Sequence, residues 1–263
     1  MMSILPDEDG NWKELVDEAT HIFYDVLHTC GIVASNVCGT PMEVKDMPVK
    51  LEVTGRYACF SRPELKVERV SYDVMTPSAA RGILEGIYRH PGMRWIIDRI
   101  TVMNPIKFSN IRRNEVSKAA NALEMRSAAM SGKAATPIYT SESIQQRSTM
   151  VLRDVHYVIE AHFEMTSKAA ADDTPAKFQS MFMRRASKGQ CFHEPYFGCR
   201  EFPVEFRLWE GQAVPEGFEK GKRDLGYMLY DMDYSNPEEI NPMFFHAHLE
   251  DGVLDLTDVR TVS

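Results

Sequence analysis

The sequence predicts an α+β fold, and two observations support this prediction. Strand-like and helix-like segments alternate in the order strand, helix, strand, then a long interruption, then strand and helix again. These segments are residues 49–59, 77–90, 93–105, 156–165 and 174–189. This order is typical of a ferredoxin-like or RRM-like sheet with helices on one face. Residues 196–263 contain only strand-like runs, which indicates a small antiparallel β domain.

We expect three parts in this chain of 263 residues, which is long enough for one large domain or two small ones. They are an acidic helical extension with a linker (1–46), an RRM-like domain (47–195) with a long insertion at about 110–150, and the β domain (196–263). The extension has nine acidic and two basic side chains, and its residues 11–28 carry an apolar helical stripe. Met47 is a plausible alternative start of translation, so we expect the extension to be dispensable.

Helix boundaries are well marked in the sequence. Thr76 and Pro77 fit the N-cap and first helical position of one helix, and Pro91-Gly92 ends it. In the second helix, the expected N-cap is Thr174, the first helical position is Pro175 and the end is Gly189. We therefore expect both helices to begin at a capped proline.

The remaining segments are predicted from their periodicity. In residues 156–165, apolar side chains alternate with histidines and glutamates, as in a strand with one buried face. Residues 117–146 are polar, rich in small residues and without sustained periodicity, so we expect a mobile insertion, and such insertions are often functional. Asp251-Gly252 predicts the turn of a β-hairpin.

Composition excludes several classes of protein. No apolar run approaches the roughly 20 residues that a bilayer requires, and the N-terminus lacks a basic start and an apolar core. We therefore expect a cytoplasmic protein that does not contact a membrane. The five scattered cysteines form no C-x-x-C pair, which predicts reduced thiols, no metal and no cofactor.

Basic side chains gather locally although the net charge is −8. In the helix at 174–189, Lys177, Arg184 and Lys188 lie within about 20° of one line beside an apolar stripe. A lysine in the first turn opposes the helix dipole, which an anion bound there would offset. Aromatic rings and further cations follow in residues 187–200, a combination that suits unpaired bases and phosphates. The helix is predicted to face RNA.

Several long segments resemble one family. They include "GRYACFSRPELKVERVSYDVMTPSAARGILEGIY", "RWIIDRITVMNPIKFSNIRRNEV" and "RRASKGQCFHEPYFGCREFP". Between about Val49 and Leu254 the chain resembles the Cas-five protein of type I-C CRISPR systems, the d-subtype of the RAMP superfamily. The resemblance implies a RAMP fold and metal-independent cleavage of pre-crRNA within each repeat. It also implies binding to the 5′ handle of the crRNA, assembly with the Cascade backbone and large subunits, and access to target DNA through that complex.

The resemblance also implies a catalytic triad of tyrosine, lysine and histidine. Tyr88 and Lys177 match the first two, whereas Phe178 stands where the family has histidine. A phenyl ring cannot exchange a proton, so the base is missing from that position and cleavage is expected to be weakened. Lys177 could lower the pKa of Tyr88, and His90 and His193 are candidate substitutes for the missing imidazole. The predicted RNA-binding residues are Arg112, Arg113, Arg147, Arg184, Arg185, Lys188, Gly189 and Arg200.

Two alternatives remain open. A non-catalytic subunit that caps the crRNA handle would need the cations but not the base. A metal-dependent enzyme could use His246 and His248, or the polar face of residues 156–164, although neither set has a third ligand at fixed spacing. No P-loop, GxGxxG or Gly-x-Ser-x-Gly motif supports an NTPase, a dinucleotide-binding protein or a serine hydrolase.

Overall fold

The computed structural model describes residues 48–262, except 66, 135, 212–214, 235 and 237. The predicted acidic extension and its helix at 11–28 lie outside the described residues, as does Met47. In the part that is described, no helix combines the length and the apolar character needed to cross a membrane.

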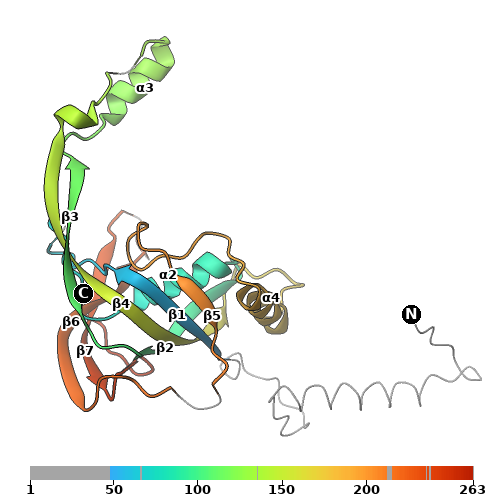
Figure 1. Ribbon diagram of the computed structural model, residues 1–263. Helices are drawn as coiled ribbons and strands as arrows, with labels where there is room; N and C mark the ends of the chain where they lie inside the picture. The colour runs from blue at the N-terminus through green and yellow to red at the C-terminus, as the bar shows by residue number, and fades with distance from the viewer. Residues whose placement is uncertain are drawn as a thin grey trace, which may run out of the picture. The chain divides into compact units, whose positions relative to one another are not determined.

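The centre of the molecule is an antiparallel sheet with two helices, which confirms the α+β class (Figure 1). Four strands lie side by side in the order β5-β1-β4-β2. They are β1 (Val49–Ala58), β2 (Met93–Val102), β4 (Ile144–Met165) and β5 (Glu205–Leu208). The helices are α2 (Pro77–Ile87) and α4 (Pro175–Ser187). Along the chain the order is β1, α2, β2, β4, α4, β5, as the sequence predicts.

The C-terminal strands extend the same sheet. β8 (Val253–Asp255) pairs with β2 and is followed outward by β7 (Asn241–Glu250) and β6 (Lys222–Asp233). Asp251 and Gly252 have positive φ angles of 48° and 76°, which confirms the predicted hairpin. The described residues all belong to one compact unit, and the predicted domain boundaries within it stay a prediction.

The long insertion is a hairpin arm rather than an aperiodic loop. β3 (Phe108–Val116) pairs with the first part of β4, and between them lie α3 (Ala122–Ser131) and the short helix η2 (Thr140–Glu142). Figure 1 shows α3 at the tip of this arm, away from the rest of the sheet. The sequence did not predict α3, because this helix buries no residue and its sequence therefore has no apolar stripe to reveal it.

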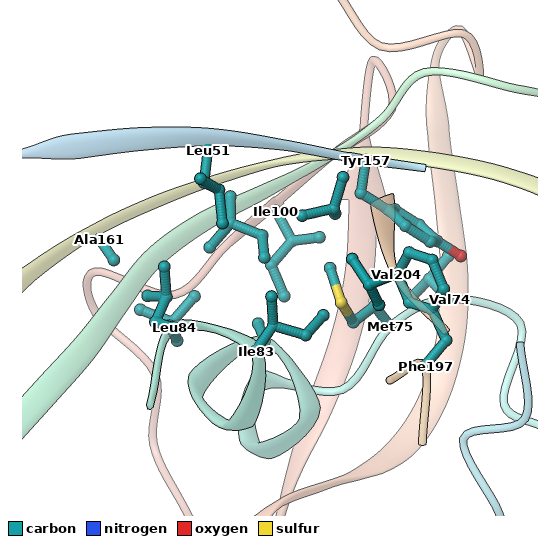
Figure 2. Packing of buried hydrophobic residues seen from close by; sticks show 14 of the residues in the cluster. Leu51, Val74, Met75, Ile83, Leu84, Ile100, Tyr157, Ala161, Phe197 and Val204 are labelled. Carbon is teal, nitrogen blue, oxygen red and sulfur yellow. The ribbon is translucent and has the colours of Figure 1, made fainter. Parts of the chain in front are cut away.

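One face of the sheet packs on α2 to form the main core. Figure 2 shows Ile83 and Leu84 of α2 directed at Leu51, Ile100 and Ala161 of three neighbouring strands. All five are at most 1% exposed. β1 and β4 contribute every second residue to this core, whereas in β2 a register shift between Ile97 and Arg99 interrupts the alternation.

The opposite face of the sheet is polar but largely buried. The predicted outward residues of β4 do lie on this face, yet Glu160 and His162 are only 7% and 8% exposed. Each has an oppositely charged or hydrogen-bonding partner. Lys50 lies 3.3 Å from Glu160, Asp98 2.8 Å from His162, and Glu52 2.8 Å from His156. His156 and His162 therefore each have a carboxylate partner on this polar face.

Candidate active site

The candidate site lies where α2 ends and α4 begins. α2 ends three residues earlier than predicted, because Tyr88 adopts extended backbone angles and caps the helix. The carbonyl of Tyr88 accepts a hydrogen bond of 3.0 Å from the indole N–H of Trp95. Phe178, in the first turns of α4, is 1% exposed and its ring lies 6.3 Å from that of Tyr88. The two helix ends thus bring Tyr88 and Phe178 together, two of the residues that were predicted for the catalytic site.

Lys177 is held by two aspartates that precede α4. Its ammonium lies 3.1 Å from Asp172 Oδ2 and 3.0 Å from Asp173 Oδ1. Hydrogen bonds to Asp173 and then Asp172 raise the pKa of Lys177. The position of Lys177 in the first turn predicts an external anion. Asp172 and Asp173 already supply negative charge there, so the helix dipole by itself does not require a bound anion.

Asp173 is the anchor of this group. Its side chain is 3% exposed, and Oδ2 accepts a hydrogen bond of 2.9 Å from the backbone N–H of Ala170. That bond, followed by the contact with Lys177, lowers the pKa of Asp173, and the nearby imidazole of His90 lowers it further. The carboxylate is therefore fixed in place and charged at neutral pH.

His90 lies between Asp173 and Phe178. Its ring centroid is 4.9 Å from that of Phe178, and its Nδ1 is 3.8 Å from Asp173 Oδ2. The backbone N–H of Gly92 donates a 3.1 Å hydrogen bond to the same Nδ1. A Cβ at residue 92 would lie 2.9 Å from Ala169 Cα, so only glycine allows this close approach.

Tyr88 is not activated as a base. Burial raises the pKa of its phenol, and the opposing effects of Arg185 and Lys177 are smaller. The Arg185 guanidinium lies 5.2 Å from the ring centroid of Tyr88 and donates a 3.0 Å hydrogen bond to the carbonyl of Ile87. The expected effect of Lys177 is present, since its charge lowers the pKa of Tyr88, but burial outweighs it and the pKa of the phenol is raised overall. The phenol therefore keeps its proton at neutral pH.

The predicted apolar stripe of α4 is confirmed, and the basic side chains of this helix differ in their exposure to solvent. Phe178, Phe182 and Ala186 are buried. Arg184 and Lys188 are exposed, whereas Arg185 points into the site as described above. Gly189 follows with a positive φ of 62°. Arg184 and Lys188 thus remain available to a phosphate backbone.

The predicted arginines of the hairpin arm are distributed over both of its faces. Arg113 and Arg147 are register partners, and Arg113 is paired with Glu201. Arg112 is exposed on the opposite face of β3. These three residues lie on the arm and not at the helix ends, so the structure divides the predicted cations into two groups.

A cleft of about 600 Å³ adjoins the site. Its lining includes Arg89, Phe192, Tyr196 and Arg200, between the end of α2 and the loop after α4. Phe192 and Tyr196 are 69% and 42% exposed. Rings and cations exposed together in a cleft suit an unpaired base and its phosphate.

The candidate metal ligands are not gathered. Within the described residues, no group of three or more His, Cys, Asp or Glu side chains is arranged to hold a metal ion. His246 lies 3.1 Å from Asp224, and the histidines of β4 have the partners given above.

Cys59 and Cys199 form a contact that the sequence analysis did not single out. Cys59 is buried, and its thiol lies close enough to that of Cys199 for a hydrogen bond that lowers the pKa of Cys199 and raises that of Cys59. Arg69 Nη1 lies 4.0 Å from Cys199 Sγ and favours the thiolate there.

The comparisons with known proteins agree with the resemblance noted in the sequence. The profile of the Cas5d family of CRISPR-associated proteins matches residues 49–257. The chain belongs to this family. Two relatives are named CRISPR pre-crRNA endoribonuclease Cas5d. The one from Mannheimia succiniciproducens is 48% identical over 217 residues, which is 79% of this chain and 94% of the relative. The one from Thermus thermophilus is 40% identical over 225 residues, 79% and 90% of the respective chains.

A solved structure described as a CRISPR-associated protein has a similar fold. Its TM-score is 0.60 at 21% sequence identity, and the match covers 82% of this chain and 97% of that one. A functionally uncharacterized protein from Streptococcus mutans matches with a TM-score of 0.57 at 21% identity, over 80% of this chain and 92% of the other.

The part of this Cas5d chain that matches the family contains every predicted site residue, whereas residues 1–48 lie outside it. Sequence reasoning missed Asp172, Asp173 and Arg89. The two aspartates had a readable signal, since they come directly before the N-cap Thr174 and only five and four residues before Lys177. Arg89 had no such signal, because only its position in the lining of the cleft singles it out.

Proposed function

We propose that this Cas5d chain cleaves pre-crRNA within the repeat and stays on the 5′ handle of the product as a subunit of type I-C Cascade. The observation that carries the proposal is the identity of 48% to a pre-crRNA endoribonuclease over 94% of that enzyme. The presence of Tyr88 and Lys177 at adjoining helix ends supports it.

The proposed reaction is attack of a ribose 2′-OH on the adjacent phosphate. A new 2′-O–P bond forms, the P–O5′ bond breaks, and the products carry a 2′,3′-cyclic phosphate and a 5′-OH. This chemistry requires in-line geometry, stabilisation of the phosphorane charge and proton transfer, and we propose that it needs no metal ion.

The side chains of the site suit two of these requirements. The Lys177 ammonium is a cation that can approach a non-bridging phosphate oxygen once RNA competes with its aspartates. Tyr88 retains its proton and can donate a hydrogen bond to the same phosphate. Phe178 is buried core and takes no part in proton transfer.

The handle is proposed to bind the surface next to this site. Arg184, Lys188 and Gly189 of α4 and Arg200 of the cleft would contact one stretch of backbone, and Arg112, Arg113 and Arg147 of the arm another. These are positions where exposed or half-buried cations adjoin the helix ends or the hairpin.

A non-catalytic handle-binding subunit is the second candidate. Two points favour it: Phe178, expected to match the family's histidine, is buried, and Lys177 is paired with Asp172 and Asp173. The cationic surface would serve this function without a base.

Incubation of the purified chain with its cognate repeat RNA in EDTA distinguishes the two. Cleavage with a 2′,3′-cyclic phosphate end, lost in Lys177→Ala, would support the nuclease. Tight handle binding by both proteins without any product would support the cap. Cleavage that appears only on addition of a divalent cation would contradict the metal-independent reaction.

A further inference from the structure

His90 offers an imidazole beside the position where the family has its histidine. Its ring lies against Phe178, with 4.9 Å between centroids, but the two side chains differ in access to solvent. Phe178 is 1% exposed, whereas the side chain of His90 is 36% exposed. The site therefore contains an accessible imidazole that comes from the loop after α2 instead of from α4.

The hydrogen bond from Gly92 fixes the state of this imidazole. Since Nδ1 accepts the N–H of Gly92, the proton of the neutral ring is on Nε2. In this tautomer the neutral ring can donate a hydrogen bond from Nε2 but cannot act as a base there. Proton donation requires the imidazolium, in which Nδ1 also carries a proton and has Asp173 Oδ2 as its acceptor in place of the Gly92 N–H.

The charged form of the ring has a counter-ion in place. Asp173 Oδ2, fixed by Ala170, lies 3.8 Å from Nδ1 and faces the ring from the loop before α4. The other titratable groups around the ring are Lys177 on α4, which is paired with the same carboxylate, and Tyr88, whose phenol is neutral. A protonated His90 is thus balanced by a carboxylate and not by solvent alone.

We propose that His90 donates the proton to the 5′-oxygen that leaves when the RNA is cleaved, an inference that rests on the proposed function. The imidazolium transfers the Nε2 proton to O5′ as the P–O5′ bond breaks. The 2′-OH loses its proton to solvent water or hydroxide as the 2′-O–P bond forms. The neutral ring then regains a proton from solvent, so the step balances without a metal or a redox partner.

The test uses the full chain, its cognate repeat RNA and the same RNA with sulfur in place of the 5′-bridging oxygen at the cut. His90→Asn is the informative variant, because the Asn amide oxygen can still accept the N–H of Gly92 but has no proton of suitable pKa to give. With ordinary RNA we expect its single-turnover rate to fall by about 10²–10⁴-fold. With the thio-substituted RNA we expect a rate close to that of the unaltered chain, because a thiolate leaves without protonation.

Two controls separate this role from a structural one. Lys177→Ala should be slow on both substrates, since sulfur does not replace a cation at the phosphate. The pH dependence of the cleavage rate should differ between the unaltered chain and His90→Asn, because only the unaltered chain uses a protonated side chain to release O5′. Binding of the handle should be the same in both.

The outcomes overturn different claims. If the unaltered chain cleaves and His90→Asn is equally fast, or is equally impaired on both substrates, His90 is not the proton donor. If the unaltered chain cleaves neither RNA, the proposed nuclease function fails and this inference fails with it.

Discussion

The ammonium of Lys177 lies 3.0 Å from the carboxylate of Asp173 and 3.1 Å from that of Asp172. The two aspartates differ in their exposure and in their other contacts. Asp172 is 81% exposed and contacts only Lys177 among the described interactions. Asp173 is 3% exposed and also faces His90. The Asp172 carboxylate screens the charge of Lys177, and the Asp173 carboxylate contacts both Lys177 and His90.

We therefore expect Asp172→Asn and Asp173→Asn to have opposite effects on cleavage. Asp172→Asn removes an exposed charge that competes with phosphate for Lys177, so RNA binding and cleavage should increase a few-fold at low salt, with a smaller gain at high salt. Asp173→Asn keeps the acceptor for Ala170 but removes the counter-ion of His90, so cleavage should slow. Single-turnover rates at several salt concentrations measure both. Faster cleavage by both variants would mean that Asp173 only screens Lys177.

Phe178→His tests the residue that departs from the family. The ring is buried against Tyr88, His90 and Phe163, so a polar imidazole there should cost about 1–3 kcal/mol of stability. If the new imidazole reaches the 2′-OH, it supplies the missing base, and we expect cleavage to rise by about tenfold or more. Thermal unfolding and single-turnover assays measure the two effects. Phe178→Leu is the matched control and should not accelerate cleavage, and an unchanged rate in Phe178→His would place the base elsewhere.

Local signals predicted much of the fold, and long-range contacts account for what was missed. Thr174-Pro175 and Asp251-Gly252 each determine a cap or a turn within a few residues, so the start of α4 and the β7–β8 hairpin could be read directly. α3 could not, because Leu123 and Met130 are 77% and 80% exposed and no buried face constrains its pattern.

The candidate site was predictable only in part. Tyr88 and Lys177 were predicted from the family resemblance, and their catalytic roles stay a prediction. The contact of His90 with Phe178 joins the end of one helix to the start of another across a long interval of sequence, and no periodicity encodes it. The raised pKa of Tyr88 likewise depends on burial by residues from several elements.

Glu52 should make stability depend on pH in the acid range. Hydrogen bonding by Arg207, then by His156, lowers the pKa of Glu52 below its ordinary value of 4.5, against the opposing effect of burial. Its stabilising contribution is therefore complete above about pH 4.5 and is lost as the pH falls through the lower, folded-state pKa. We expect Glu52→Gln to lower stability at pH 7 by about 1–3 kcal/mol, because the buried group loses its charge-assisted partners.

Thermal unfolding of both proteins between pH 3 and pH 7 checks this prediction. The difference in Tm should shrink toward zero at the acid end, where the glutamate is protonated. Glu216→Gln is a suitable control, since that side chain is 88% exposed and should leave Tm unchanged at every pH. A difference that stays constant with pH would show that the loss comes from packing and not from charge.

Cys199 should be unusually reactive for a half-buried thiol. The hydrogen bond from Cys59 and the nearby guanidinium of Arg69 lower its pKa, so a larger share of it is thiolate at neutral pH. We expect iodoacetamide to modify Cys199 at pH 7, and Arg69→Gln to slow that modification by removing a charge that favours the thiolate. Peptide mass spectrometry over a time course measures the rate at each cysteine, and equal rates in both proteins would contradict the role of Arg69.

The tip of the hairpin arm should be required for assembly but not for folding. α3 buries no residue. The Ser117 N–H donates a 2.9 Å hydrogen bond to the Ser143 carbonyl next to the last β3–β4 pair, so a short turn can join Ser117 to Ser143 directly. Replacing residues 118–142 with Asn-Gly should therefore leave Tm within about 2 °C of the unaltered chain. The tip also exposes apolar side chains, including Leu123, Met130 and Tyr139, which suit a protein partner.

We expect the shortened chain to bind the crRNA handle more weakly and to fail to assemble with the type I-C backbone and large subunits. Handle-binding curves and co-purification from cells that express the other subunits measure these effects. The triple change Leu123→Ser, Met130→Ser and Tyr139→Ser is the matched variant, because it keeps the length of the arm and removes only its apolar surface. If the triple variant assembles and the shortened chain does not, the arm acts through its reach or its backbone. If both assemble normally, the arm is not the docking surface.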